Sequence, residues 1–522
     1  FLNYGYRSRQ DVDFGQFSGA RLQSALGPSA DFDGDGVPEC YADINNPDTL
    51  VQGCVPLNMF GGGSVVRETG EIVTATLTQD MIDYVSADLV DTFLTKQTIW
   101  GGSVSGSLFD LPGGALGWAA GYQYWKQEYK YTPDSGKATG AVTGNVGAGT
   151  NGSLTNDAVF LEVLAPLWDN GSQELVLKGG LRYDDYDAFD GDTTYQIGVE
   201  FQVIDNLKLR GTYGTVFRAP TITELYGGVI DSFPTYTDPC VNDVPTPPGC
   251  GAGPFIQSDS QVRSAIGGNP NVQPETGDTY TAGLVWTPEF GDHAFTATLD
   301  YWQIDLEDGI SSLGVSYTLD ACYYDLNQQA CDLITRDQFG QITLIQDTQL
   351  NVASQGAKGV DTEVRWNYSS SWGQWEAAVL WSHLLERTKV AFPGDAENDL
   401  SGRYTDPTAQ DGGAYAEDKV NYSLQWMWND LSVGYLGEYI SSLDGDTVFF
   451  GTDYIQKIDS QLYHDIVASY TMSNWGLTLS GGVTNITDEP PPFIDVGFNA
   501  KTDPSTYRLF GLGYYLRASW KF

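Results

Sequence analysis

Strict alternation of apolar and polar residues recurs along most of this chain. In the run Tyr195–Val203 the large apolar side chains fall at odd positions, and the even positions carry Gln, Gly and Glu. A period of two is typical of a β-strand rather than a helix. Polar residues occupy the face that a sandwich would pack into its core, so we expect that face to line water and the apolar face to contact lipid. This pattern predicts a transmembrane β-barrel.

The alternation is repeated in at least four other segments. Taken alone, any one of them would rather indicate a half-buried strand of a soluble sheet. The repetition favours an all-β antiparallel barrel. The apolar positions are Leu175, Leu177, Leu181 and Tyr183; Leu207, Leu209 and Tyr213; Phe295, Ala297, Leu299 and Tyr301; and Tyr422, Leu424, Trp426 and Trp428.

Composition supports this interpretation. Only 41% of the 522 residues are hydrophobic, and no stretch is apolar and long enough for a membrane helix, which excludes a helical membrane protein. Aromatic rings prefer the headgroup level of a membrane. We therefore expect tryptophans at the strand ends to form girdles, namely Trp100, Trp118, Trp168, Trp286, Trp428 and Trp520.

Short and long connections alternate along the chain. Short turns such as Asp205-Asn206 and Asn429-Asp430 separate long polar segments. Outer-membrane barrels have short periplasmic turns and long extracellular loops, so the pattern predicts about sixteen strands with all long loops outside the cell. The predicted loops are 10–97, 133–155, 219–275, 309–356, 391–417, 443–459 and 488–505.

Several short motifs carry a family resemblance. They are Tyr213–Thr221 followed by Glu224-Leu225-Tyr226, Gly268–Thr276, Gly359-Val360-Asp361, Gly482–Asp488, Cys54–Asn58 and the terminal Phe522. In this order and spacing they resemble the TonB-dependent receptors of Gram-negative outer membranes, over essentially the whole chain. Arg517 departs from the usual glycine of the last strand.

The resemblance implies a barrel of about 22 strands filled by an N-terminal plug, which a short TonB-binding box precedes. This chain begins inside a strand, at Phe1–Arg7. We therefore expect residues 1–522 to form the C-terminal part of the barrel. The plug and the first strands would be on another chain, cleaved or absent from this sequence.

Six cysteines fall in three close pairs, Cys40 with Cys54, Cys240 with Cys250, and Cys322 with Cys331. Six cysteines allow fifteen connectivities, and pairing within one loop is the simplest. Each bond would stabilise its loop by about 2–3 kcal/mol on the chain-entropy argument. Zinc is the competing interpretation, but histidines are lacking nearby.

One loop has the spacing of a calcium site. Carboxylates at positions 1, 3, 5 and 9 of the segment, with glycine at 6, suit a hard cation. The candidate ligands are Asp31, Asp33, Asp35, Glu39, the backbone carbonyl of Val37, and Asp43 in place of the missing bidentate glutamate. A solvated acidic turn without an ion remains the alternative. No redox or nucleotide cofactor is expected.

Two further features concern the loops. Apolar residues at helical spacing predict an amphipathic helix over 77–94, above the barrel mouth. The formal net charge is −42, which makes nucleic acid an improbable partner. Solvation of the loops is the default explanation of this charge. The more specific alternative is that the acidic loops attract cations, or bind lipopolysaccharide through bridging divalent cations.

No catalytic constellation is recognisable, so an enzyme is not expected. The resemblance implies energised import across the outer membrane, in which loops capture a scarce ligand and TonB acts through the plug. The alternative is a plugless porin-like channel or a surface structural protein. Oligosaccharides, iron-siderophores and cobalamin are the ligand classes considered. Loop aromatics that could stack on a ligand, or merely pack, are Tyr226, Phe233, Tyr236, Phe255, Tyr323, Phe449 and Phe450.

Overall fold

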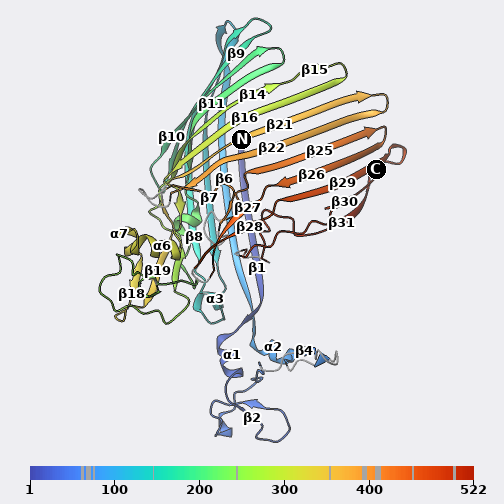
Figure 1. The fold of residues 1–522 in the computed structure, drawn as a ribbon. Helices are drawn as coiled ribbons and strands as arrows, with labels where there is room; N and C mark the ends of the chain where they lie inside the picture. Colours follow the sequence, from blue (N-terminus) through green and yellow to red (C-terminus); the bar gives the residue numbers. More distant parts are fainter. Residues whose placement is uncertain are drawn as a thin grey trace.

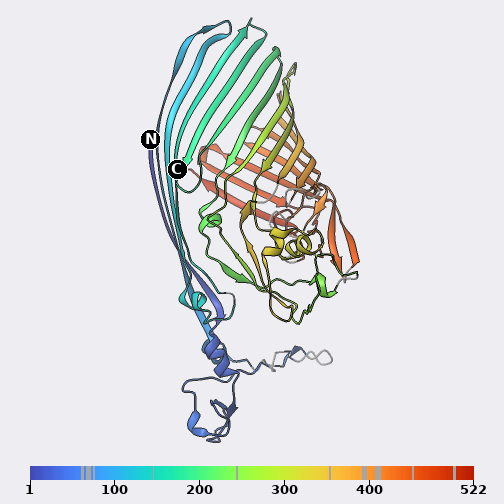
Figure 2. The same cartoon turned by 90° about the vertical axis from the view of Figure 1, so that its left-hand side faces the viewer.

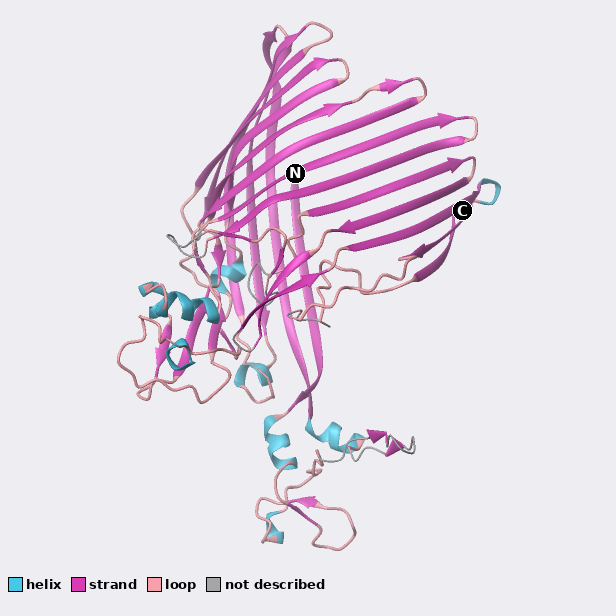
Figure 3. Cartoon of the chain, in the orientation of Figure 1, coloured by secondary structure: helices cyan, strands magenta, loops and turns pink. Residues whose placement is uncertain are grey.

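A single large antiparallel sheet dominates the computed structural model (Figure 1, Figure 3). The residues described are 1–59, 64–65, 72–73, 77–144, 146–242, 245–351, 354–390, 397–405, 413–449, 452–495, 497 and 501–521. The sheet has 18 strands, of which β15 (Glu289–Phe290) and β23 (Asn398–Asp399) are only two residues long. The other sixteen strands of this sheet agree in number with the prediction.

The long strands follow one another in the sheet in chain order. Each pairs antiparallel with its neighbours, and among the described residues β1 has only β6 beside it and β31 only β30. The strands are β1 (Leu2–Phe17), β6 (Ser86–Leu111), β7 (Gly114–Thr132), β8 (Thr150–Asp169), β9 (Glu174–Tyr186), β10 (Asp192–Ile204), β11 (Leu207–Arg218), β14 (Glu275–Trp286), β16 (His293–Glu307), β21 (Gln355–Ser370), β22 (Gly373–Lys389), β25 (Asp418–Trp428), β26 (Leu431–Ile440), β29 (Gln461–Met472), β30 (Leu477–Thr484) and β31 (Gly513–Trp520).

The register confirms the two faces expected from the alternation. Directly paired residues of antiparallel strands point to the same face. Val199 pairs with Leu177, and Glu200 with Arg210, so apolar residues share one face and charged residues the other. We call these the apolar face and the polar face. Trp168 and Trp286 lie on the apolar face near the short turns, where they pair with Leu175 and Leu207.

The connections at one end of the sheet are short, and the long ones all lie at the other end, where only 187–191, between β9 and β10, is short among the described connections (Figure 1). Two-residue turns join β10 to β11 and β25 to β26, as predicted. Asn429 has a φ of 51°, a left-handed conformation that asparagine tolerates better than most residues.

The first long loop is shorter than predicted. Strand β1 continues to Phe17 and β6 begins at Ser86, so the expected loop 10–97 is in fact 18–85. The two strands stay paired beyond the rest of the sheet and carry this loop away from it as a projection (Figure 2). The predicted loop 133–155 also ends early, because β8 starts at Thr150.

The prediction of a helix over 77–94 was wrong for the second half of this segment. Helix α2 (Gln79–Val85) forms, with Thr78 accepting a hydrogen bond from the Met81 N–H at its N-terminus. From Ser86 onward the chain is strand, because it pairs with β1. Helix α2 lies in the projection beside α1 (Gly19–Ala25), not above the mouth of the sheet.

The long loops pack into small cores of their own. One buries Tyr404, Tyr463 and Tyr507 among aliphatic residues of three connections, β22–β25, β26–β29 and β30–β31. Beside it, Arg508 binds Glu438 and Asp465, with nitrogen-to-oxygen distances of 2.9 and 3.0 Å. Another buries Leu154 of β8 against Ile222 and Leu225 of α4 (Ile222–Tyr226). Among the described residues no helix is long and apolar enough to cross a bilayer.

Candidate functional site

The β11–β14 and β16–β21 connections together form a compact unit, which we call the disulfide module (residues 230–267 and 312–348). Its sheet has the order β12 (Ile230–Ser232), β13 (Ser264–Gly267), β19 (Ile342–Thr348) and β18 (Ile334–Arg336). Strands β13 and β19 are parallel and come from different connections. Helices α5 (Pro239–Asn242), α6 (Val315–Tyr323) and α7 (Gln328–Asp332) complete the unit.

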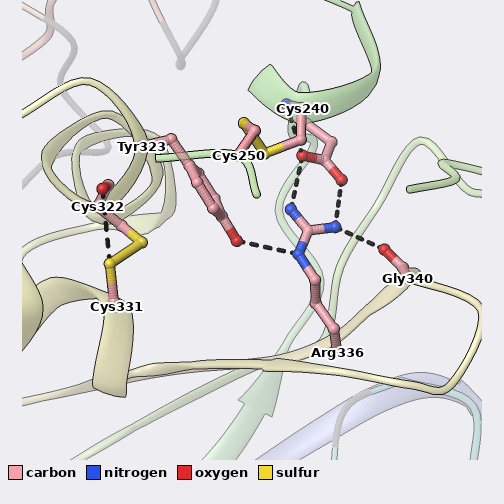
Figure 4. Close-up of a disulfide and its surroundings, with 8 residues drawn as sticks. Cys240, Cys250, Cys322, Tyr323, Cys331, Arg336 and Gly340 are labelled. Carbon is pink, nitrogen blue, oxygen red and sulfur yellow. Dashed lines mark hydrogen bonds and ion pairs between the residues drawn. A yellow bond between two sulfur atoms is a disulfide. The ribbon is translucent and has the colours of Figure 1, made fainter. Parts of the chain in front are cut away.

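All three predicted disulfides form in the structure. Cys240–Cys250 and Cys322–Cys331 lie within the module (Figure 4), and Cys40–Cys54 lies in the projection. Each bond joins neighbours within one connection, with sequence separations of 9 to 14 residues. Side chains of the two module disulfides pack against its buried core, so cross-links and apolar burial stabilise the same unit.

A half-buried arginine links several parts of the module, and the sequence analysis missed it. The Arg336 guanidinium donates to both oxygens of Asp238 at 2.6 and 2.8 Å, to the Gly340 carbonyl at 2.6 Å and to the Tyr323 hydroxyl at 2.9 Å (Figure 4). Asp238 is fully buried. Burial lowers the pKa of Arg336, but Asp238 and Tyr323 outweigh it and hold that pKa above its usual value.

The module decides which loop aromatics a ligand could reach. Tyr236 and Tyr323 are buried in its core, so these two predictions of stacking residues were wrong. Phe233 and Tyr226 remain exposed, at 45% and 36%. Phe255 is half-buried, with its ring 5.0 Å from the Arg336 guanidinium carbon.

Two aromatic candidates belong to the β26–β29 connection. Phe449 is the last residue of strand β27 (Leu443–Phe449), and Phe450 lies outside the described residues.

The acidic loop brings three of its six predicted ligands together. Carboxylate oxygens of Asp31, Asp33 and Asp35 lie within 4.8 Å of one another, and all three residues are exposed. Backbone N–H groups of Gly36 and Gly34 donate to Asp31 at 2.9 and 2.7 Å, and the Gly36 bond chiefly lowers the pKa of this carboxyl.

The remaining predicted ligands are outside this group. Glu39 accepts a hydrogen bond from the Tyr41 hydroxyl at 2.8 Å, and this bond chiefly raises the pKa of Tyr41 to about 12. Asp43 accepts one from the Asn45 N–H at 2.9 Å. Glycines 34 and 36 have φ of 78° and 87°, which lets the backbone between the carboxylates turn sharply. The calcium site therefore stays a prediction, with Asp31, Asp33 and Asp35 as its centre.

The polar face carries a row of ion pairs across β9, β10, β11 and β16. Glu200 binds Lys178 and Lys208, and Arg210 binds Asp300 through two hydrogen bonds of 2.8 and 2.6 Å. A cavity of about 560 Å³ is lined by Lys178, Glu200, Arg210, Asp300 and Trp302. Glu200 pairs directly with Arg210, and Arg210 reaches Asp300 across Gly283 of the intervening strand β14. Only the strand pairing reveals this row, although the alternation places each charge on the polar face.

Comparison with known families accounts for this architecture. A family model described as TonB dependent receptor-like, beta-barrel matches residues 3–486. The chain belongs to this family.

Solved structures of low sequence identity share the fold of this TonB-dependent receptor barrel. A mutant of the ferric enterobactin receptor of Pseudomonas aeruginosa is 14% identical, with a TM-score of 0.54 over 83% of this chain and 54% of its own. A siderophore receptor of Acinetobacter baumannii is 13% identical, with a TM-score of 0.54 over 87% of this chain and 57% of its own. The chain thus spans about half the length of these receptors.

Proposed function

We propose that this TonB-dependent receptor barrel lies in the outer membrane and takes part in TonB-energised uptake of a scarce ligand into the periplasm. One observation carries the proposal: all long, folded loops gather at one end of a sheet that is apolar on one face and charged on the other. The family membership supports it. A ligand held by the loops at that end would pass along the polar face, and no enzymatic activity is proposed.

The ligand class is proposed from charge and surface chemistry. The net charge of −42 disfavours a strongly anionic ligand. Exposed Phe233 and Tyr226 offer rings to a sugar or another flat surface. An oligosaccharide, or a neutral or cationic iron-siderophore or cobalamin-like complex, therefore fits best. The named ligands of the solved receptors do not extend to this chain, because the likeness is one of fold.

Uptake measurements test this function. Cells lacking the gene are compared with complemented cells for accumulation of labelled ligands from the three classes, each with and without TonB. We expect one class to accumulate only when both the gene and TonB are present. TonB-independent accumulation, or steady conductance of the purified full-length protein in planar bilayers, would instead establish the porin-like alternative.

We also propose that the loop Asp31–Asp35 binds calcium and stiffens the projection. The clustered carboxylates and the two left-handed glycines support this proposal. Cys40 lies five residues beyond Asp35, so a cation and the Cys40–Cys54 bond would restrain the same short segment.

A further inference from the structure

The projection contains an apolar cavity between its two helices. The C-terminal end of α1, the segment 55–59 and the first turn of α2 surround it. The Leu57 N–H donates to the Ala25 carbonyl at 2.9 Å, which fixes the segment 55–59 beside α1. The volume of the cavity is about 1170 Å³. We call this cavity the projection groove, and its apolar lining includes Leu26, Val37, Val55, Leu57, Met59 and Met81.

Much of this lining is in contact with solvent. Val37 and Met59 are 61% and 64% exposed, and Leu26 is 49% exposed. The projection stands away from the large sheet and from the disulfide module in both views (Figure 1, Figure 2), so neither of them covers the groove. Exposed apolar side chains that gather around a cavity are typical of a binding surface, whereas singly scattered ones are not.

The size of the groove and its methionines favour a peptide as the occupant. Pockets for single small ligands have volumes of about 300–1,000 Å³, and the projection groove exceeds that range. Two of the four methionines of the chain, Met59 and Met81, line it. Methionine side chains are flexible and polarisable, so they adapt to the varied apolar side chains of a peptide.

The surroundings of the groove are strongly acidic. The loop 18–85 has ten acidic and two basic residues, compared with 68 and 26 in the whole chain. Asp80 lines the groove itself, and Asp35 precedes the lining residue Val37 by two positions. An apolar cavity with an acidic rim is complementary to a chain segment that is apolar on one side and positively charged on the other.

We propose that the projection groove binds a cationic amphipathic peptide from outside the cell. The peptide binds as a short helix, with its apolar side chains in the groove and its lysine or arginine side chains toward the acidic rim. Such helices place apolar anchors at helical spacing into a groove of the partner. This interaction goes beyond ligand uptake. It rests on the long loops facing the outside of the cell, as proposed above, and not on transport.

Binding of a synthetic peptide to the purified full-length protein tests the site. The probe is a fluorescent peptide of about twelve residues, three turns of helix, with leucine and lysine at helical spacing. Fluorescence anisotropy is measured in a non-ionic detergent with EDTA, so that no cation held by Asp31–Asp35 weakens the acidic rim. The groove variant carries Val37→Gln and Met59→Gln, and the control variant carries Ile44→Gln and Val229→Gln at exposed positions outside the groove. We expect the groove variant to bind the probe about tenfold more weakly than the wild type and the control variant do.

Two control peptides separate the apolar contribution from the charge contribution. Serine replaces every leucine in one, glutamate replaces every lysine in the other, and both should bind the wild type about tenfold more weakly than the probe does. Equal affinity of the two protein variants for the probe would show that the groove is not the site. Equal affinity for the serine peptide would show general charge attraction, and equal affinity for the glutamate peptide would show no preference for a cationic partner. Each of these results would overturn the proposal.

Two further measurements do not depend on the folding of the groove variant or address another occupant. A photo-reactive leucine analogue in the probe should cross-link wild-type protein at residues 55–59 and 78–81, and cross-links elsewhere would contradict the proposal. Sedimentation measures self-association of the full-length protein. A wild-type dimer that the groove variant does not form would assign the groove to a second copy of this chain instead of a peptide.

Discussion

Arg336 of the disulfide module gives the sharpest test of how the loops are stabilised. Replacing it by methionine would leave Asp238 buried without its cation, and breaking a buried ion pair costs about 3–5 kcal/mol. The barrel itself should be unaffected, because every partner of the guanidinium lies in the module. The loss should therefore appear as local unfolding of residues 230–267 and 312–348, without the intervening barrel strands.

Hydrogen–deuterium exchange followed by mass spectrometry measures this local stability. Each 1.4 kcal/mol corresponds to a tenfold change in exchange protection, so peptides covering β13 and β19 should lose about 10² to 4 × 10³-fold protection in Arg336→Met. Peptides from β10 serve as the internal reference. The matched control is Arg263→Met, whose ion pair with Asp231 is more exposed and should contribute less than about 1 kcal/mol.

A double variant completes the test. Combining Arg336→Met with Asp238→Leu removes both charges, and such apolar replacements are often neutral or stabilising. Protection should then return most of the way toward that of the wild type. If Arg336→Met exchanges no faster than Arg263→Met, the buried pair does not stabilise the module and the reasoning fails.

Three further predictions concern the loops. Asp31→Asn should abolish calcium binding measured by calorimetry while Asp43→Asn leaves it intact, because only Asp31 lies in the cluster; equal loss in both would restore the longer ligand set. Cys322→Ser with Cys331→Ser should destabilise the module by about 3 kcal/mol on the chain-entropy argument, seen as faster proteolysis of 309–348 and unchanged heat resistance of the barrel. Burial raises the pKa of Glu224, but Arg218 and Thr221 outweigh burial and hold this pKa below its usual 4.5, so the stability that ionised Glu224 gives to α4 is present above pH 4.5 and is lost as the pH falls through the lower pKa of the folded state. Hydrogen exchange of residues 222–226, corrected for intrinsic rates, should therefore increase only in that acidic range. Glu224→Gln should remove this pH dependence.

The sequence was sufficient for features that depend on local spacing. Alternation with period two predicted the strands, and residues such as Asn429-Asp430 predicted the turns, because both signals lie within a few residues. The disulfides were predictable for the same reason, since each joins cysteines at most 14 residues apart. The ends of β1 and β6 could not be predicted from the alternation. The two strands stay paired beyond the part of the sheet where apolar and polar residues alternate.

Features that depend on distant residues could not be read from the sequence. Leu77, Met81 and Leu89 have helical spacing, yet Leu89 is in a strand because pairing with β1 outweighs local periodicity. Tyr236 and Tyr323 were expected at a loop surface, and only the meeting of two connections buries them. Asp238 and Arg336 are 98 residues apart, so no local sequence pattern predicts their contact.

The parallel pairing of β13 with β19 has a consequence for how this protein folds. Residues 264–267 contact residues 345–348, so one connection cannot complete its sheet until the chain has reached the other. Pairing between segments so far apart is slow, because the intervening chain must first be ordered. The disulfides span short distances and can close earlier, within each connection. We therefore expect refolding to show two phases, early local oxidation and a later step in which both connections dock together.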